Sequence, residues 1–273
     1  MTKPTIAILG AGAMGSAIGR YLTQSGARVL TTLEGRSAAS ASRAREAGME
    51  DASIDRLVAC DFLLSIVPPG VAVESAERLV DVLSQSAKKP VYIDCNAISP
   101  DTVAVIANVL ASTGAPFVDG AIIGAPTSPK FYMSGPHAAQ TAQLNYAGLV
   151  VRVLDGPLGA ASALKMSYAG ITKGLTALGS AMSLAAMRNG AGKALFDELS
   201  ESQPELLKWL SGNVPRMPPK AYRWVAEMEE IAAFIGADFV EHRIYEGAAG
   251  LYDRLSKDKD ATGVLEKFFK KED

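Results

Sequence analysis

The first 156 residues alternate between short apolar runs and longer stretches in which apolar residues recur every three or four positions. Short apolar runs predict strands, and the longer spacing predicts helices. We expect strands at 5–9, 28–33, 62–67, 90–94, 117–122, 130–134 and 150–154. We expect the helices between them at 13–25, 37–47, 71–86, 99–112 and 137–147. This alternation predicts an α/β domain with a doubly wound, mostly parallel sheet and right-handed crossovers.

The pattern changes after the segment Gly156-Pro157-Leu158-Gly159, beyond which no strand is expected. Helical spacing predicts helices at 160–188, 193–200, 203–211, 217–236, 239–256 and 261–270. We therefore expect two domains, an α/β domain over 1–156 and an all-helical domain over 157–273. No internal repeat is evident in the chain.

A glycine-rich loop follows the first predicted strand, and a predicted helix follows the loop. Its glycines, Gly10, Gly12 and Gly15, have the spacing G-x-G-x-x-G, with Ala13 and Met14 between the last two. The first glycine permits a tight turn, the second lets a pyrophosphate approach the backbone, and the third lets helix and strand pack closely. The positive end of the helix favours the same anion. The loop predicts a dinucleotide-binding Rossmann domain, and a purely structural glycine turn is the alternative.

Composition excludes several classes of protein. The net charge of −2 gives no reason to expect a nucleic-acid partner, and no apolar run approaches the roughly 20 residues that span a membrane. The two histidines and two cysteines do not form a metal-ligand pattern, so no metal is expected. Cys60 and Cys95 adjoin predicted strands, which favours buried thiols in a reducing compartment. The first strand begins too early for a signal peptide, and we expect a cytoplasmic protein.

The end of the second predicted strand bears on the choice between NAD and NADP. Glu34 lies where an acidic residue would bind the ribose hydroxyls of NAD. Arg36 and Ser37 follow at once and suit the 2′-phosphate of NADP, although Ser37 is also a good helix N-cap. We favour NADP and keep NAD open.

Two further strand ends carry candidate site residues. Val67, Pro68 and Pro69 follow the third strand and are expected to lie against the nucleotide. Asn96 follows the fourth strand, and its amide could hydrogen-bond a substrate oxygen or the nicotinamide carboxamide. An Asx turn is the alternative for Asn96.

The helix predicted at 160–188 has three distinct stripes at 100° per residue. The first stripe carries Lys165, Tyr168, Thr172 and Thr176. The second is apolar and carries Leu164, Ile171, Leu175, Leu178 and Met182. The third has small residues: Ala163, Gly170, Gly174, Ala177, Ala181 and Ala185. The small face predicts close approach by another helix, from the same chain or from a second copy, and we expect a homodimer.

These motifs resemble those of the β-hydroxyacid dehydrogenase superfamily, which includes 6-phosphogluconate and 3-hydroxyisobutyrate dehydrogenases. The resemblance rests on the loop at 10–15, the segment 96–100 ending Ser-Pro, Met133-Ser134-Gly135, and Gly156, Gly159 and Lys165 near the domain junction. It implies that Lys165 is the catalytic acid/base. A buried lysine with a lowered pKa could exchange a proton with the oxygen at which charge develops during hydride transfer.

Departures from the family pattern affect the expected substrate. Tyr168 and Ala169 stand where the family usually has asparagine, and Glu227 aligns with a second family lysine. The family's polar substrate loop is replaced by a more apolar one, in which we expect Gly120, Ala121, Ile122, Ile123 and Gly124 to contact substrate. Tyr168, Thr172 and Glu227 are further candidates for substrate contact, and a core aromatic or a solvated helix face are their alternatives.

The sequence therefore predicts an NAD(P)-dependent oxidoreductase acting on a small polar carbonyl or hydroxy substrate. Lys165 would be the acid/base, with Asn96 and Tyr168 beside it. Reduction of an imine on the same scaffold is the closest alternative. A non-catalytic NADP-binding sensor is the alternative from another class.

Overall fold

The computed structural model describes residues 3–125 and 127–270. The chain divides into two compact units, Met1–Lys165 and Met166–Asp273. The division falls inside one long helix, α7 (Ala160–Arg188), whereas the sequence pattern placed the domain boundary at 156. Each unit is described by itself.

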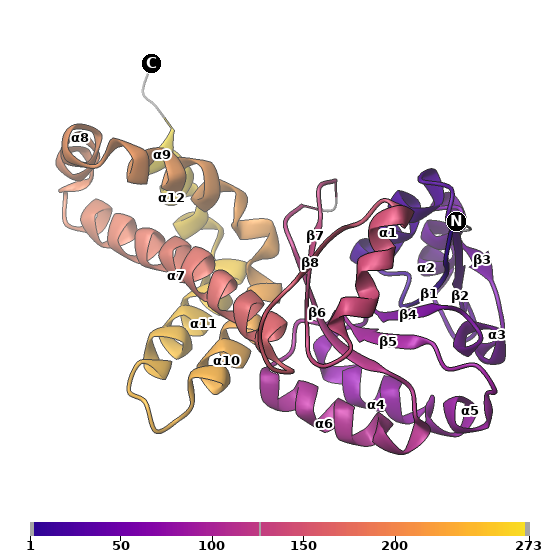
Figure 1. Ribbon diagram of the computed structural model, residues 1–273. Coiled ribbons are helices and arrows are strands. Elements are labelled where there is room, and N and C mark those ends of the chain that lie inside the picture. Colours follow the sequence, from indigo (N-terminus) through magenta and orange to yellow (C-terminus); the bar gives the residue numbers. More distant parts are fainter. Residues whose placement is uncertain (1–2, 126, 271–273) are drawn as a thin grey trace. The chain divides into compact units, whose positions relative to one another are not determined.

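The first unit is built on one eight-stranded sheet with the order β3-β2-β1-β4-β5-β6-β7-β8 (Figure 1). Its strands are β1 (Thr5–Leu9), β2 (Arg28–Thr31), β3 (Glu50–Asp51), β4 (Phe62–Ser65), β5 (Val91–Asp94), β6 (Phe117–Ile123), β7 (Lys130–Ser134) and β8 (Val150–Val153). Only the pairing of β6 with β7 is antiparallel. The predicted mostly parallel sheet is confirmed. The strand missing from the prediction, β3, consists of two exposed acidic residues at the sheet edge, so it carries no apolar signal.

Two hydrophobic layers cover the sheet, one on each face. In β1, Ile6 and Ile8 belong to one layer, whereas Ala7 and Leu9 belong to the other, because successive strand side chains point to opposite faces. Helices α1 (Ala13–Gln24) and α2 (Ala38–Glu46) contribute to the first layer. Helices α3 (Ile54–Val58), α4 (Ala72–Glu77), α5 (Val80–Gln85) and α6 (Pro100–Leu110) contribute to the second. Burial on both faces explains why the strands are continuous apolar runs.

Two predicted helices differ from the structure. The stretch 71–86 contains a 3-10 turn, η1 (Pro69–Val71), and the two short helices α4 and α5. The stretch predicted at 137–147 is a 3-10 segment, η3 (Ala138–Ala147), not an α-helix. There Thr141 and Asn145 donate side-chain hydrogen bonds to the carbonyls of Ala138 and Ala142, three residues earlier. Such bonds compete with regular helical ones.

The second unit is helical throughout its described residues, as predicted. After α7 come α8 (Gly192–Ser202), α9 (Pro204–Asn213), α10 (Ala221–Ile235), α11 (His242–Lys257) and α12 (Lys259–Phe269), with 3-10 turns η4 (Val214–Arg216) and η5 (Pro218–Lys220) before α10. Tyr245 of α11 covers the small-residue face of α7 at Gly170 and Gly174, since a Cβ added at Gly170 would lie 3.0 Å from its hydroxyl oxygen. The same chain therefore supplies the close partner of this face.

Two of the expectations from composition can be checked against the structure. Cys60 and Cys95 are free and buried, as expected. Within the described ranges, no helix has the length and apolar character needed to cross a membrane.

The loop between β1 and α1 is closely packed against its surroundings. Gly10 has φ +93°, and a Cβ there would lie 2.4 Å from the carbonyl oxygen of Ile66. A Cβ on Gly15 would lie 1.9 Å from the carbonyl oxygen of Gly10, whereas a Cβ on Gly12 would meet nothing within 4 Å. Gly10 and Gly15 are therefore required by the fold itself, and Gly12 is not.

This contrast predicts different effects of two alanine substitutions. Gly15→Ala forces the loop away from α1, and we expect it to lower the free energy of unfolding by about 1–3 kcal/mol. Gly12→Ala is the matched control, which should leave the midpoint of thermal unfolding within about 2 °C of the wild-type value. Thermal and urea unfolding followed by circular dichroism measure both. Equal stability of Gly15→Ala and wild type would contradict the packing argument.

Candidate functional site

The N-terminus of α1 lies at the carboxyl end of β1 and is open to an anion. Gly12 precedes the helix, and no side chain caps its first turn, which begins with Ala13, Met14 and Gly15. Uncapped N–H groups and the positive end of the helix dipole suit a pyrophosphate. Arg43 of α2 donates a 3.3 Å hydrogen bond from Nε to the carbonyl oxygen of Ala11 and brings a positive charge to the same loop. The loop therefore fits the phosphates of a dinucleotide.

A hollow of about 560 Å³ lies beside the ends of β1 and β2. It is lined by Leu9, Thr32, Glu34, Gly35, Arg36, Ile54, Val71, Glu74, Ser75, Arg78 and Leu79. Glu34 and Arg36 are both exposed and flank Gly35, which turns the chain with φ +66°. Ser37 caps α2, since its hydroxyl oxygen accepts a hydrogen bond from the amide of Ser40. The volume suits a nucleotide half of a dinucleotide.

Asn96 joins the ends of two neighbouring strands. Its side-chain oxygen accepts a 2.7 Å hydrogen bond from the amide of Val67, beyond the end of β4. Its side-chain nitrogen donates to Ser65 Oγ and to Asp94 Oδ2, at 3.0 and 2.8 Å. Asn96 is 2% exposed. The amide thus fixes the loop that leads into Pro68 and Pro69, and because both of its hydrogens are used, it could donate to a ligand only by giving up one of these bonds.

Lys165 lies on the first turns of α7, and its amine reaches the end of β5. Nζ lies 3.2 Å from the carbonyl oxygen of Asn96 and 3.4 Å from that of Cys95. Burial of the amine lowers the pKa of Lys165, and nearby Cys95, Asp94 and Asp119 oppose that shift. Burial raises the pKa of Asp94 to about 7, against two hydrogen bonds from Asn96. Two groups in this cluster are therefore shifted toward neutral pH, which is common where protons are transferred.

Asp119 of β6 binds the first turn of α7, the helix that carries Lys165. Its Oδ2 accepts hydrogen bonds from Ser134 Oγ at 2.9 Å and from the amide of Ser162 at 3.0 Å. Its Oδ1 accepts a 2.6 Å bond from Ser162 Oγ. Ser134 Oγ accepts in turn from the amide of Ala161, at 2.9 Å. Strands β6 and β7 thereby hold the start of the helix that carries Lys165.

The segment expected to be a substrate loop lies largely within β6. Gly120, Ala121, Ile122 and Ile123 pair with β7, from Gly120 opposite Met133 to Ile123 opposite Lys130. Ala121 is fully buried, and Ile122 packs in a core layer. The strand predicted at 117–122 is confirmed and ends at Ile123, so most of the segment expected to contact substrate belongs to this strand and not to a loop. Gly124, at φ +107°, begins the turn.

The remaining candidates belong to the helical unit. Tyr168 is 53% exposed, and its carbonyl oxygen accepts a hydrogen bond from Thr172 Oγ1. Glu227 of α10 forms an ion pair with Lys173 of α7, whose amine also lies over the ring of Trp224. Glu227 is thus held by a neighbouring helix within its own unit.

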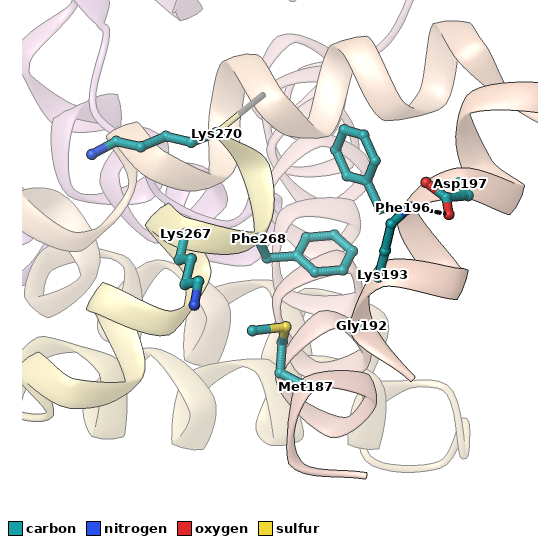
Figure 2. Close-up of a pocket in the computed structure, with 8 residues that line it drawn as sticks. All are labelled: Met187, Gly192, Lys193, Phe196, Asp197, Lys267, Phe268 and Lys270. Carbon is teal, nitrogen blue, oxygen red and sulfur yellow. Dashed lines mark hydrogen bonds and ion pairs between the residues drawn. The ribbon is translucent and has the colours of Figure 1, made fainter. Parts of the chain in front are cut away.

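A separate hollow of about 400 Å³ lies in the helical unit (Figure 2). It is lined by Met187, Gly192, Lys193, Phe196, Asp197, Lys267, Phe268 and Lys270. Phe196 and Phe268 meet edge to face, and Lys193 pairs with Asp197. None of the residues predicted for the site lines it. Across 3–125 and 127–270, no group of three or more histidine, cysteine or acidic residues could hold a metal ion.

Sequence reasoning missed several residues that support this site. Asp94 is the last residue of a predicted strand, so its position at a strand end was a usable signal. Asp119 lies in the middle of a strand, and its partners Ser134 and Ser162 are distant along the chain. Arg78, which lines the larger hollow and pairs with Glu74, is one more arginine on a predicted helix. Ser134 belongs to the segment Met133-Ser134-Gly135 that carries the family resemblance, but no sequence pattern pairs it with Asp119 or distinguishes Arg78.

Two family models match the chain. The model described as the NAD binding domain of 6-phosphogluconate dehydrogenase covers residues 5–143, just over half of the chain. A domain of unknown function, DUF1932, covers residues 186–255 in the helical unit. A comparison with curated proteins found no match.

Solved structures with a similar fold cover nearly the whole chain. The conserved protein MTH1747, of unknown function and described as similar to 3-hydroxyacid dehydrogenases, is 28% identical with a TM-score of 0.78, over 96% of this chain and 99% of that one. The 3-hydroxyisobutyrate dehydrogenase of Mycobacterium tuberculosis is 20% identical with a TM-score of 0.75, over 97% and 99%. An imine reductase of Myxococcus stipitatus is 20% identical with a TM-score of 0.60, over 98% and 100%.

These matches confirm the resemblance inferred from the glycine loop and the segments around Ser134 and Lys165. The helical region after the sheet is confirmed as well. The chain belongs to the family defined by the NAD binding domain of 6-phosphogluconate dehydrogenase, and it is a β-hydroxyacid dehydrogenase-like protein with a helical C-terminal region.

Proposed function

We propose that the protein is an NAD(P)-dependent oxidoreductase that acts on a small polar carbonyl or hydroxy substrate, with Lys165 as the general acid/base. The observation that carries the proposal is the amine of Lys165, held at the carbonyls of Cys95 and Asn96. This position is at the carboxyl end of β5, the edge of a parallel sheet where ligands bind.

Each residue has a physical role in this mechanism. The nicotinamide, when bound, supplies or accepts the hydride. Lys165 gives a proton to the oxygen as negative charge develops, or takes it in the reverse direction. Burial lowers the pKa of Lys165 toward neutral pH, and a pKa near the working pH favours this exchange. Asn96 keeps the Val67 loop and Asp94 in place around it.

The proposed substrate contacts come from α7 and from the end of β6. Tyr168 and Thr172 follow Lys165 by one and two turns of α7, on the same stripe. The backbone around Gly124 opens from the end of β6. The side chains of Ala121 and Ile122 are buried in the core of the sheet. We therefore propose that this part of β6 supports the backbone of the site. Glu227 contributes only if substrate displaces Lys173 from it.

NADP is the proposed cofactor. Arg36 and Arg78 line the hollow beside β2, and Arg43 reaches the glycine loop. Three arginines around one nucleotide site favour the additional phosphate of NADP. Glu34, in the same hollow, supports NAD as the alternative.

A second copy of the chain is the proposed partner. Ile171, Leu178 and Met182 of α7 are between 54% and 68% exposed. Their spacing of seven and four residues places them on the apolar stripe. Tyr245 already covers Gly170 and Gly174 on the small-residue face, so the apolar stripe is the surface that a second copy would bury.

Replacement of the lysine tests the proposed reaction. We expect Lys165→Met to lower kcat by about 10²- to 10⁴-fold, because the proton donor is lost. In the direction of reduction, wild-type activity should fall as pH rises through the lowered pKa of Lys165, because only the protonated amine donates. NADPH oxidation at 340 nm with small aldehydes, keto acids and ketone–amine mixtures measures both.

Lys89→Met is the matched control, because the amine of Lys89 also donates to backbone carbonyls, those of Leu83 and Ser84. It should retain wild-type turnover. Full activity of Lys165→Met on a confirmed substrate would refute the proposed role. Turnover only when an amine is present would assign imine reduction instead, and cofactor binding without turnover on the whole panel would favour a sensor.

The cofactor assignment predicts a selective loss of affinity. Arg36→Ala should raise the Kd for NADPH about tenfold and leave that for NADH within about twofold, because only NADPH carries the 2′-phosphate. Arg20→Ala, an exposed arginine on α1 outside the hollow, should change neither value. Cofactor fluorescence titration measures both constants. Unaltered NADPH binding in Arg36→Ala, with NADH bound as tightly, would refute the NADP assignment.

The proposed dimer predicts a change in mass. Leu178→Asp places a charge on the apolar stripe and should convert a dimer to a monomer in light scattering at micromolar concentration. Val105→Asp, on the exposed side of α6, is the control and should leave the mass unchanged. A wild-type protein that is monomeric under these conditions would refute the dimer.

A further inference from the structure

Asp119 is the most completely enclosed carboxylate of the site. It is 0% exposed and lies in the middle of β6. A charge so deeply buried is costly unless hydrogen bonds replace its water. Asp119 accepts three, from Ser134 Oγ, Ser162 Oγ and the amide of Ser162. All its partners donate, as an ionised carboxylate requires.

These bonds provide hydrogen-bond partners for the first N–H groups of α7. Gly159 precedes the helix and has no side chain with which to cap it. The first N–H groups of a helix need partners from elsewhere when they are buried. Here the amide of Ala161 donates to Ser134 Oγ, and that of Ser162 donates to Asp119. The cap of α7 is therefore supplied by two strands of the sheet.

We propose that Asp119 is a positioning residue that, with Ser134, anchors the first turn of α7 and thereby holds the amine of Lys165 at the carbonyls of Cys95 and Asn96. Ser162 and Lys165 are three residues apart, about one helical turn, so a displacement of the first turn moves Lys165 with it. The value of this anchor for catalysis rests on the proposed function. The anchor itself does not.

Asp119 also acts on Lys165 through its charge. The titratable groups that face the amine are Asp94 and Cys95 at the end of β5 and Asp119 on β6. Burial lowers the pKa of Lys165, and the charge of Asp119 opposes that shift. Removing the charge while keeping the shape should therefore lower the pKa of Lys165 further.

The test follows Lys165 and the first turn of α7 in the full chain, without cofactor or substrate. Asp119→Asn removes the charge and places an amide hydrogen donor among the donors of Ser134 and Ser162. Ser134→Ala keeps the charge and removes the partner of the Ala161 amide together with one of the three hydrogen bonds to Asp119. Lysine labelled with carbon-13 at Cε reports the titration by NMR, and the resonance missing from Lys165→Met identifies Lys165. Hydrogen exchange reports the amides of Ala161 and Ser162.

Asp119→Asn should move the Lys165 titration to lower pH and increase exchange at Ala161 and Ser162 about fivefold or more. Ser134→Ala should increase exchange at Ala161 by a similar factor. The control is Thr141→Ala, which removes an equally buried hydroxyl that donates to the carbonyl of Ala138, remote from α7 in the sequence. It should change neither reading.

A Lys165 titration and exchange rates in Asp119→Asn equal to those of wild type would overturn the proposal. If Asp119→Asn does not fold, Ser134→Ala decides, and unchanged exchange at Ala161 would overturn the anchor. These readings need no substrate. Failure of Lys165→Met to reduce activity would refute the proposed function while leaving the anchor intact, so the two failures are distinguishable.

Discussion

The structure of this site depends on the requirement that buried polar groups be hydrogen-bonded. Ser65, Asp94 and Asn96 satisfy one another at the ends of β4 and β5. Asp119 and its serine partners do the same between β6, β7 and the start of α7. Because an unsatisfied buried group costs about 1–3 kcal/mol, these networks leave few alternative positions for the strand ends. The amine of Lys165 lies where the two networks approach each other.

This arrangement separates the groups that hold the site from the group proposed to react. Asn96 has its side-chain oxygen and nitrogen engaged within the protein, so it behaves as a fixed support. Within the described part of the chain, the amine of Lys165 instead makes two long contacts, both with carbonyl oxygens. A carbonyl oxygen accepts a hydrogen bond from the protonated amine, but it is neutral and forms no ion pair with it. Such surroundings orient the amine while burial keeps its proton exchangeable.

The glycine loop illustrates how one motif serves both the fold and the ligand. Gly10 and Gly15 allow β1 and α1 to approach closely, which is a packing requirement independent of any cofactor. Gly12 has free space where a side chain would be, and it lies at the uncapped start of α1. The spacing of the glycines was therefore readable from the sequence. The reason for each glycine became clear only from its neighbours, which include the carbonyl of Ile66, just beyond the end of β4.

The sequence alone predicted the alternation of strands and helices and the dinucleotide loop, because these depend on local spacing and on motifs, whereas the role of Lys165 as acid/base stays a prediction. The sequence did not determine that β6 pairs antiparallel with β7, that the Asn96 amide binds Val67, Ser65 and Asp94, or that Tyr245 covers Gly170 and Gly174 of α7. Those facts depend on partners distant in the chain. Asp119 is the clearest case, since its function as a cap depends on a helix that begins about forty residues later. Only tertiary structure brings such groups together, because hydrogen bonding and burial act between neighbours in space.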